Sequence, residues 1–152
     1  MIETHGDFKP TNPKDRMATS RLDLSLFPDT ATAYGALGMV EGDCKYGGYN
    51  YRVRGVLASV YVAALRRHIS KWYNGEWNDG KTGVPHLASA IACLAIIIDA
   101  HEVGVLKDDR PPSVHMTSLL DEFEKKVKHL QSIFPDGPDR YTQLMEVKEG
   151  DK

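Results

Sequence analysis

The chain has 152 residues, a formal net charge of −2 at pH 7 and a pI of about 6.3. This length allows one domain with a real core, and the weak charge excludes a general attraction to nucleic acid or to an anionic membrane. Two cysteines, Cys44 and Cys93, are too few for a disulfide framework, so in the absence of a signal peptide we expect a reduced, cytoplasmic protein.

The amino-terminal segment, about 1–22, is polar and contains the sequence KPTNPKDR. Pro10 and Pro13 exclude a regular helix there, and we predict an extended arm. The arm is either a disordered terminus or a segment whose basic side chains fold over a phosphate site. A helical core over about 23–134 and a polar tail over about 135–152 complete the single expected domain.

Four helices are predicted in the core, at about 28–40, 56–73, 85–100 and 113–134. The second shows apolar residues at the i, i+3, i+4, i+7 spacing of an amphipathic helix. The third is apolar all round and too short to span a bilayer, so we expect it to be buried on every side. The fold class is therefore all-α, a bundle of four main helices.

The fourth helix carries apolar residues in alternating steps of four and three, a heptad stripe that packs against another helix. Its members are Met116, Leu120, Phe123, Val127, Leu130 and Phe134. The stripe packs either on its own bundle or on a second copy of the chain. Because three helices barely cover the apolar third helix, we favour a homo-oligomer, a dimer or a tetramer.

The stretch EGDCKYGGYNYRVRG, residues 41–55, combines glycines with basic and aromatic side chains, and we expect it to form a loop. Its cations suit phosphate groups, its rings can stack on a base, and its amide can read the base edge. The candidates are Lys45 and Arg54 for phosphate, Tyr46 and Tyr51 for stacking, and Asn50 for the edge. The alternative is a solvated loop with its tyrosines packed on the core.

The second helix adds three candidate substrate-binding residues, Arg67, His68 and Trp72. Arg67 is a further cation for phosphate, although a solvated side chain is the alternative. Trp72 offers another ring for the base. His68 lies on the apolar face, where a histidine is either a satisfied core residue or a ligand.

The loop 74–83 contains Glu76 and Asp79, two carboxylates of the kind that hard cations such as Mg²⁺ bind. We expect this pair to hold a metal ion, with Glu41 and His86 as further possible ligands; a plain polar turn is the alternative. Asp99 lies thirteen positions after His86, about 20 Å along a helix axis, so the two cannot share an ion.

Five segments together resemble a known family: KPTNPKD, EGDCKYGGYNYR, RGVLASVYVAALRRHISKW, NGEWNDGKTGVPHLASAIACLAIIIDA and DDRPP. The chain looks like the phage dATP/dGTP diphosphohydrolase domain, the MazZ-like branch of the MazG-type all-α nucleotide pyrophosphohydrolases, over roughly residues 9–112. The residues that match the pattern of this branch are Lys45, Tyr46, Asn50, Arg67, His68, Trp72, Glu76, Asp79 and His86. The wider superfamily carries its metal on ExxE and ExxD motifs inside two central helices, whereas the ExxD here lies in a predicted loop.

The resemblance implies cleavage of a purine deoxynucleoside triphosphate, dGTP or dATP, to the monophosphate and pyrophosphate. It also implies Mg²⁺ or Mn²⁺ as cofactor, assembly as a dimer or tetramer, and, in phages that replace adenine by 2-aminoadenine, a supply of dGMP for the modified base. Glu76, Asp79 and Lys45 are the expected catalytic residues, and we favour dGTP. Two other interpretations stay open: a nucleotide-binding module without catalysis, and a structural helical protein that oligomerises.

Overall fold

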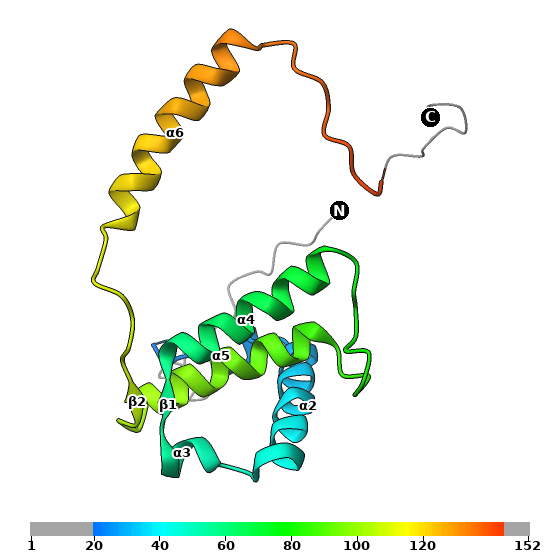
Figure 1. Ribbon diagram of the computed structural model, residues 1–152, viewed down its shortest axis with the longest axis vertical. Helices are drawn as coiled ribbons and strands as arrows, with labels where there is room; N and C mark the ends of the chain where they lie inside the picture. Colours follow the sequence, from blue (N-terminus) through cyan, green and yellow to red (C-terminus); the bar gives the residue numbers. More distant parts are fainter. Residues whose placement is uncertain (1–19, 145–152) are drawn as a thin grey trace, which may run out of the picture. The chain divides into compact units, whose positions relative to one another are not determined.

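The computed structural model of the chain describes residues 20–144, so most of the predicted arm and the end of the tail lie outside the described residues. The chain divides into two compact units, Met1–Arg110 and Pro111–Lys152, and each is described by itself. The predicted all-α class is confirmed, with four long helices among the described residues. They are α2 (Asp29–Tyr46), α4 (Ala58–Tyr73), α5 (His86–Glu102) and α6 (Met116–Ile133) (Figure 1).

The first unit also contains four short elements that the sequence did not predict. They are the 3-10 turn η1 (Leu24–Leu26), the helix α3 (Asn50–Arg54) and the strands β1 (Val56–Leu57) and β2 (Leu106–Lys107). The two strands pair in parallel, with Val56 opposite Leu106. Elements this short are fixed by their neighbours in the fold rather than by a repeating pattern in their own residues.

The predicted end of α2 and the predicted loop 41–55 are wrong. The helix continues past Val40 to Tyr46, and residues 50–54 form α3 after a glycine turn. Gly38 is the place where α2 meets α5, because a Cβ atom at this position would lie 2.4 Å from the carbonyl oxygen of Ala88. Close packing of the helices there compensates for the poor helix propensity of glycine.

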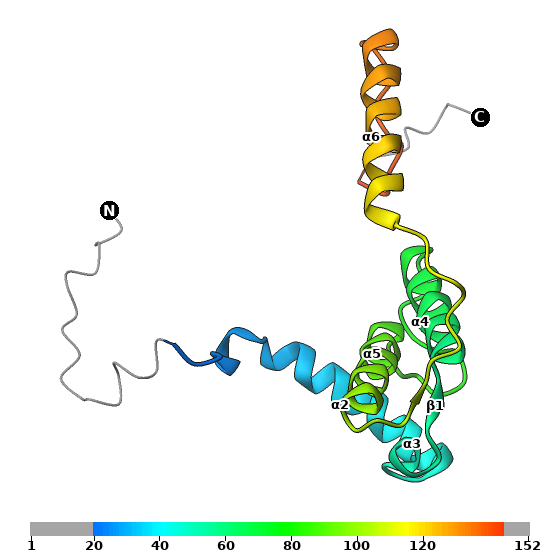
Figure 2. The same cartoon turned by 90° about the vertical axis from the view of Figure 1, so that its left-hand side faces the viewer.

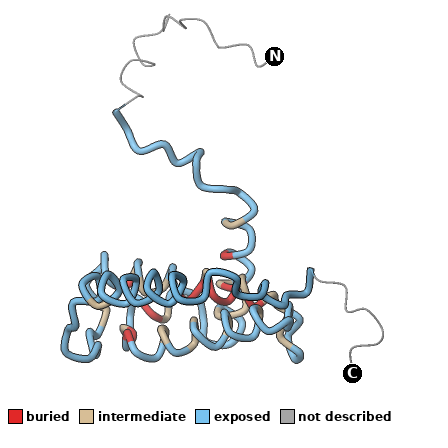
Figure 3. The backbone as a smooth tube through the Cα atoms, turned by 90° about the horizontal axis from the view of Figure 1, so that it is seen from above, coloured by how far each residue is buried: buried red, intermediate tan, exposed pale blue. Residues whose placement is uncertain are grey.

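Helix α5 lies at the centre of the first unit, with α4 beside it and α2 crossing it (Figures 1 and 2). Buried residues are few and concentrate in α5 (red in Figure 3), where most are alanines. The expectation that α5 is buried on every side is wrong within the described residues, because Leu94 is 46% and Ile98 62% exposed. Only one side of the helix faces α2 and α4.

Two carboxylates form hydrogen bonds between elements of the first unit. Asp109 accepts a hydrogen bond from the backbone N–H of Ser59 at 2.8 Å and another from the Ser59 hydroxyl, which caps the positive end of α4. Asp99 on α5 accepts two hydrogen bonds from Arg52 on α3, at 2.8 and 2.7 Å. Asp99 is therefore used to hold α3.

The described part of the second unit consists of α6 and the irregular residues that flank it. His115 caps the helix, because its Nδ1 accepts from the backbone N–H of Ser118. The apolar stripe of α6 is about half exposed from Met116, at 54%, to Leu130, at 52%. Across residues 20–144, no helix combines the length and the apolar character needed to cross a bilayer.

Candidate functional site

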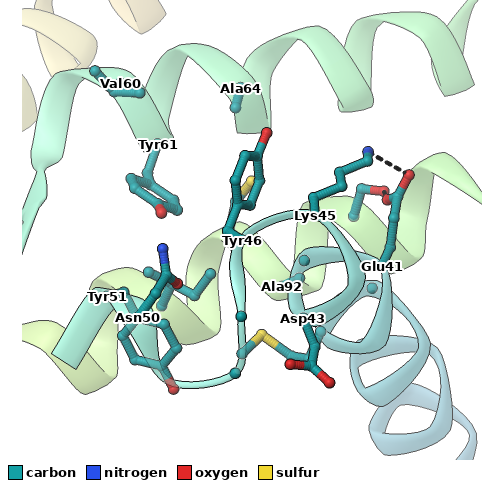
Figure 4. Close-up of a pocket in the computed structure, with 18 of the residues that line it drawn as sticks. Glu41, Asp43, Lys45, Tyr46, Asn50, Tyr51, Val60, Tyr61, Ala64 and Ala92 are labelled. Atoms are coloured by element: carbon teal, nitrogen blue, oxygen red, sulfur yellow. Dashed lines mark hydrogen bonds and ion pairs between the residues drawn. The ribbon is translucent and has the colours of Figure 1, made fainter. Parts of the chain in front are cut away.

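A cavity of about 460 Å³ opens in the first unit between the end of α2, the glycine turn, α3, α4 and α5 (Figure 4). Its two ends differ in chemistry. The lining combines Glu41, Lys45, Arg67 and His68 with Tyr46, Asn50, Tyr51 and Tyr61. Figure 4 shows Lys45 and Glu41 on one side and Asn50, Tyr51 and Tyr61 on the other. The cavity thus offers charge and aromatic surface to the two parts of a single ligand.

The extension of α2 places Glu41 and Lys45 one turn apart at the charged end. Lys45 Nζ lies 2.7 Å from Glu41 Oε1, and the Ser89 hydroxyl on α5 donates to Glu41 Oε2 at 3.4 Å. Burial by itself would raise the pKa of Glu41, but hydrogen bonds from Lys45, Thr82 and Ser89 outweigh it and leave the pKa below its ordinary value. The Glu41 carboxylate is therefore ionised at neutral pH.

The loop 74–83, which carries Glu76 and Asp79, turns back on itself before α5 begins. Asp79 Oδ1 accepts from the backbone N–H groups of Lys81 and Thr82, each at 3.0 Å, and from the Thr82 hydroxyl at 3.3 Å. These bonds, first that from the Thr82 backbone, lower the pKa of Asp79. The Thr82 side chain also contributes to the lowered pKa of Glu41. Thr82 therefore lies near both the loop carboxylate and the α2 carboxylate, and its single hydroxyl proton can be donated to one of them at a time.

A pair of histidines joins α4 to the start of α5. The Nδ1 atoms of His68 and His86 lie 3.1 Å apart, so one of them carries the proton that the other accepts. His86 is fully buried, and its Nε2, without a hydrogen-bond partner, lies 3.9 Å from Glu76 Oε2. Burial, followed by the neighbouring His86, lowers the pKa of His68. His68 is partly buried and also lines the cavity, and its role as a ligand stays a prediction.

The structure gathers some of the predicted site residues in the cavity and leaves others outside it. The lining includes Glu41, Lys45, Tyr46, Asn50, Tyr51, Arg67 and His68. The remaining five, Arg54, Trp72, Glu76, Asp79 and His86, do not line it. Arg54 is exposed at the end of α3, and the ring of Trp72 meets Trp77 edge to face with centroids 6.3 Å apart.

Sequence reasoning assigned no role to three residues that belong to this region: Tyr61, Thr82 and Ser89. Each left a signal that could have been used. Ser89 is the one polar residue inside a long apolar run. Thr82 follows Asp79 by three positions, a spacing at which an aspartate side chain accepts from the backbone of a turn. Tyr61 precedes His68 by seven positions and so shares its helix face.

A model of the family "dATP/dGTP diphosphohydrolase, N-terminal" matches residues 11–110. The chain belongs to this family. The match covers the described part of the first unit up to its last residue, Arg110, and includes every residue of the cavity. Comparison with curated proteins and with solved structures gives no match. As a dATP/dGTP diphosphohydrolase, the chain is a nucleotide pyrophosphohydrolase.

Pyrophosphohydrolases of this type generally use divalent metal ions, and the carboxylates of the diphosphohydrolase fit such an ion in their chemistry. Among the described residues, no three His, Cys, Asp or Glu side chains lie close enough together to hold an ion by themselves. Mg²⁺ does not need such a cage, because it is usually held by one or two carboxylates together with substrate phosphates and water. Glu41 and Asp79, which both lie near Thr82, offer that smaller set, and Lys45 lies beside Glu41.

Proposed function

We propose that this diphosphohydrolase cleaves a purine deoxynucleoside triphosphate between its α and β phosphates and releases the monophosphate and pyrophosphate. The observation that carries the proposal is the cavity with one charged and one aromatic end. A nucleotide has the same division into an anionic chain and a flat ring. Among the purines we favour dGTP, with dATP as the alternative.

The aromatic end suits the base. Tyr46 and Tyr51 supply ring faces, and the Asn50 side chain carries both a donor and an acceptor that can meet the edge of a base. Figure 4 shows the Asn50 amide pointing into the cavity toward Tyr61. These three residues come from the end of α2 and from α3. The ion pair between Arg52 and Asp99 attaches α3 to α5.

The charged end suits the phosphates and their counterions. Lys45 and Arg67 supply positive charge, and Glu76 and Asp79 are the proposed metal carboxylates with Glu41 as a third. His86 is a further proposed metal ligand, since its buried Nε2 lies 3.9 Å from Glu76 Oε2. A bound Mg²⁺ or Mn²⁺ ion would neutralise phosphate charge and activate a water molecule. Lys45 donates a hydrogen bond to Glu41, and we expect its positive charge to stabilise the pyrophosphate leaving group.

The direct test is turnover. Purified protein incubated with dGTP and Mn²⁺ should release dGMP and pyrophosphate, and EDTA should abolish the reaction. The appearance of dGDP and single phosphate would show that a different bond is cleaved. A panel of the four deoxynucleoside triphosphates would decide between dGTP and dATP and would contradict the purine assignment if dCTP or dTTP were hydrolysed as fast.

A nucleotide-binding protein without catalysis is the second candidate, because the described residues contain no ready cluster of three metal ligands. Binding of dGTP without any release of pyrophosphate in the presence of Mn²⁺ would favour it. For the active enzyme we further propose a homo-oligomer, and a role in the nucleotide metabolism of a phage that makes 2-aminoadenine DNA in the host cytoplasm. Neither nucleic acid nor membrane is a predicted partner.

A further inference from the structure

Tyr61 places an aromatic ring from α4 at the end of the cavity away from Glu41. It shares a face of the helix with Ala64 and His68, three and seven positions later, and all three line the cavity. Ala64 has a small side chain, so α4 projects little into the cavity between the ring of Tyr61 and the charged end. The face thus changes from the phenol ring of Tyr61 to the imidazole of His68 over two turns, and the cation Arg67 lies next to His68 in the lining.

The ring of Tyr61 is fixed before any ligand arrives. It packs against the buried cluster formed by Tyr51, Val56 and Ala100, while its other side borders the cavity. Burial, with smaller effects from Cys93, Tyr46 and Tyr51, raises the pKa of its phenol, which therefore stays neutral. A ring held in this way loses little side-chain freedom when a ligand binds.

The space beside Tyr61 is bordered by a second ring and by small side chains. In Figure 4, Tyr46 and Tyr61 lie on either side of an open region with the Asn50 amide below. On α5, the cavity is lined by Ser89, Ala92, Cys93 and Ile96. The first three have small side chains, which leave room where larger core residues would fill the space. A flat ligand fits this arrangement better than a round one.

We infer that Tyr61 stacks on the base of the substrate, forms one wall of a slot opposite Tyr46, and thereby determines base specificity. This inference rests on the proposed function, which it deepens by assigning the base to the α4 side of the cavity. A purine offers two fused rings to such a slot and a pyrimidine one, so the stacking contact favours purines. Tyr61 acts on binding of the base and has no part in breaking the phosphate bond.

Calorimetry with the two reaction products separates the base from the phosphates, because dGMP carries the base and pyrophosphate does not. The variants are Tyr61→Ala and Tyr61→Phe, with Tyr73→Ala as the control, since Tyr73 lies on the same helix but is 81% exposed and outside the cavity. Tyr61→Ala should weaken dGMP binding by roughly five- to a hundred-fold, the range of base stacking on aromatic side chains. Tyr61→Phe keeps the ring and should bind dGMP like the unaltered protein, as should Tyr73→Ala. Pyrophosphate should bind all four proteins equally.

Several results would overturn the inference. One is unchanged dGMP affinity in Tyr61→Ala; another is no binding of dGMP by the unaltered protein. Equal loss of dGMP and pyrophosphate binding in a variant that keeps its helical circular dichroism would assign Tyr61 a purely structural role. The proposed function is judged separately, by release of pyrophosphate from dGTP by the unaltered protein, so either idea can fail while the other stands.

Discussion

Thr82 lies near two carboxylates that belong to different elements. Its hydroxyl lies 3.3 Å from Asp79 Oδ1, and its side chain contributes to the lowered pKa of Glu41. All the hydrogen bonds to Asp79 given above end on Oδ1, so Oδ2 is the oxygen best placed to receive an ion. The loop therefore fixes the orientation of Asp79 through one oxygen while the other is available for chemistry.

Replacing Asp79 by asparagine separates the charge of this residue from its role in the loop. The asparagine Oδ1 can still accept from Lys81 and Thr82, so the variant should keep the fold by circular dichroism. Turnover of dGTP should fall by roughly 100-fold or more, since even the outer partners of a metal site contribute about 10–100-fold. The control is Asp108→Asn, which weakens an exposed contact with Arg110 outside the cavity and should leave turnover unchanged. Full activity in Asp79→Asn would move the metal site elsewhere.

Lys45 is the cation that lies closest to Glu41 in the cavity. Lys45→Ala should weaken binding of dGTP by roughly 10- to 100-fold, the size of a hydrogen bond to a charged group. The matched variant is Lys107→Ala, which removes the same charge from an exposed position outside the cavity. Equal affinities in a fluorescence titration of the two variants would assign Lys45 to the fold rather than to the phosphates.

At the level of elements, α2 offers a matched pair of glycines. A Cβ at Gly38 would meet the backbone of Ala88, which cannot yield easily, whereas a Cβ at Gly42 meets nothing within 4 Å. Gly38→Ala should therefore destabilise the protein by about 1–3 kcal/mol, as overpacking does. Gly42→Ala should stabilise it by about 0.5–1 kcal/mol through higher helix propensity. Urea unfolding of both variants measures the two effects, and a shift of the same sign in both would contradict the packing of α2 on α5.

The cap of α4 by Asp109 gives a prediction about pH. Hydrogen bonds from Ser59 lower the pKa of Asp109 below its ordinary value of 3.8. A carboxyl whose pKa is lower in the folded state stabilises the fold above the pKa of the unfolded chain, and this contribution disappears as the pH falls through the folded pKa. Asp109→Ala should therefore unfold at a lower urea concentration than the parent at pH 7, with a smaller gap at pH 3. A gap that widens in acid would contradict this role.

The long helices could be predicted from the sequence, and the site only in part. Repeating apolar spacing located α4 and α6, and a continuous apolar run located α5, because each is longer than three turns. The continuation of α2 through Gly38 could not be predicted, since it depends on contact with Ala88, far along the chain. The same extension brings Glu41 and Lys45 to the cavity. The sequence thus predicted seven of the residues that line the cavity, and their roles in binding a nucleotide stay predictions.

At the scale of the whole molecule, two of the apolar surfaces that are exposed among the described residues lie on α5 and α6. One is the outer side of α5, where Leu94 and Ile98 face away from α2 and α4, and the other is the stripe of α6. Exposed apolar surfaces of this kind mark sites of association. A heptad stripe is suited to a partner helix, whereas α5 presents a shorter surface.

We expect the chain to assemble through the α6 stripe, because its 3.5-residue period keeps one side of the helix facing a partner. Light scattering at micromolar concentration should report at least twice the chain mass of 16.9 kDa. Leu120→Lys combined with Phe123→Lys places two charges in the stripe and should reduce the mass toward that of one chain. Lys125→Ala, a change on the opposite side of α6, should leave it unaltered. A parent protein that is a monomer would contradict the proposal. An oligomer that persists in the double variant would show that the interface lies on another surface. The exposed side of α5 would then be tested by Leu94→Lys.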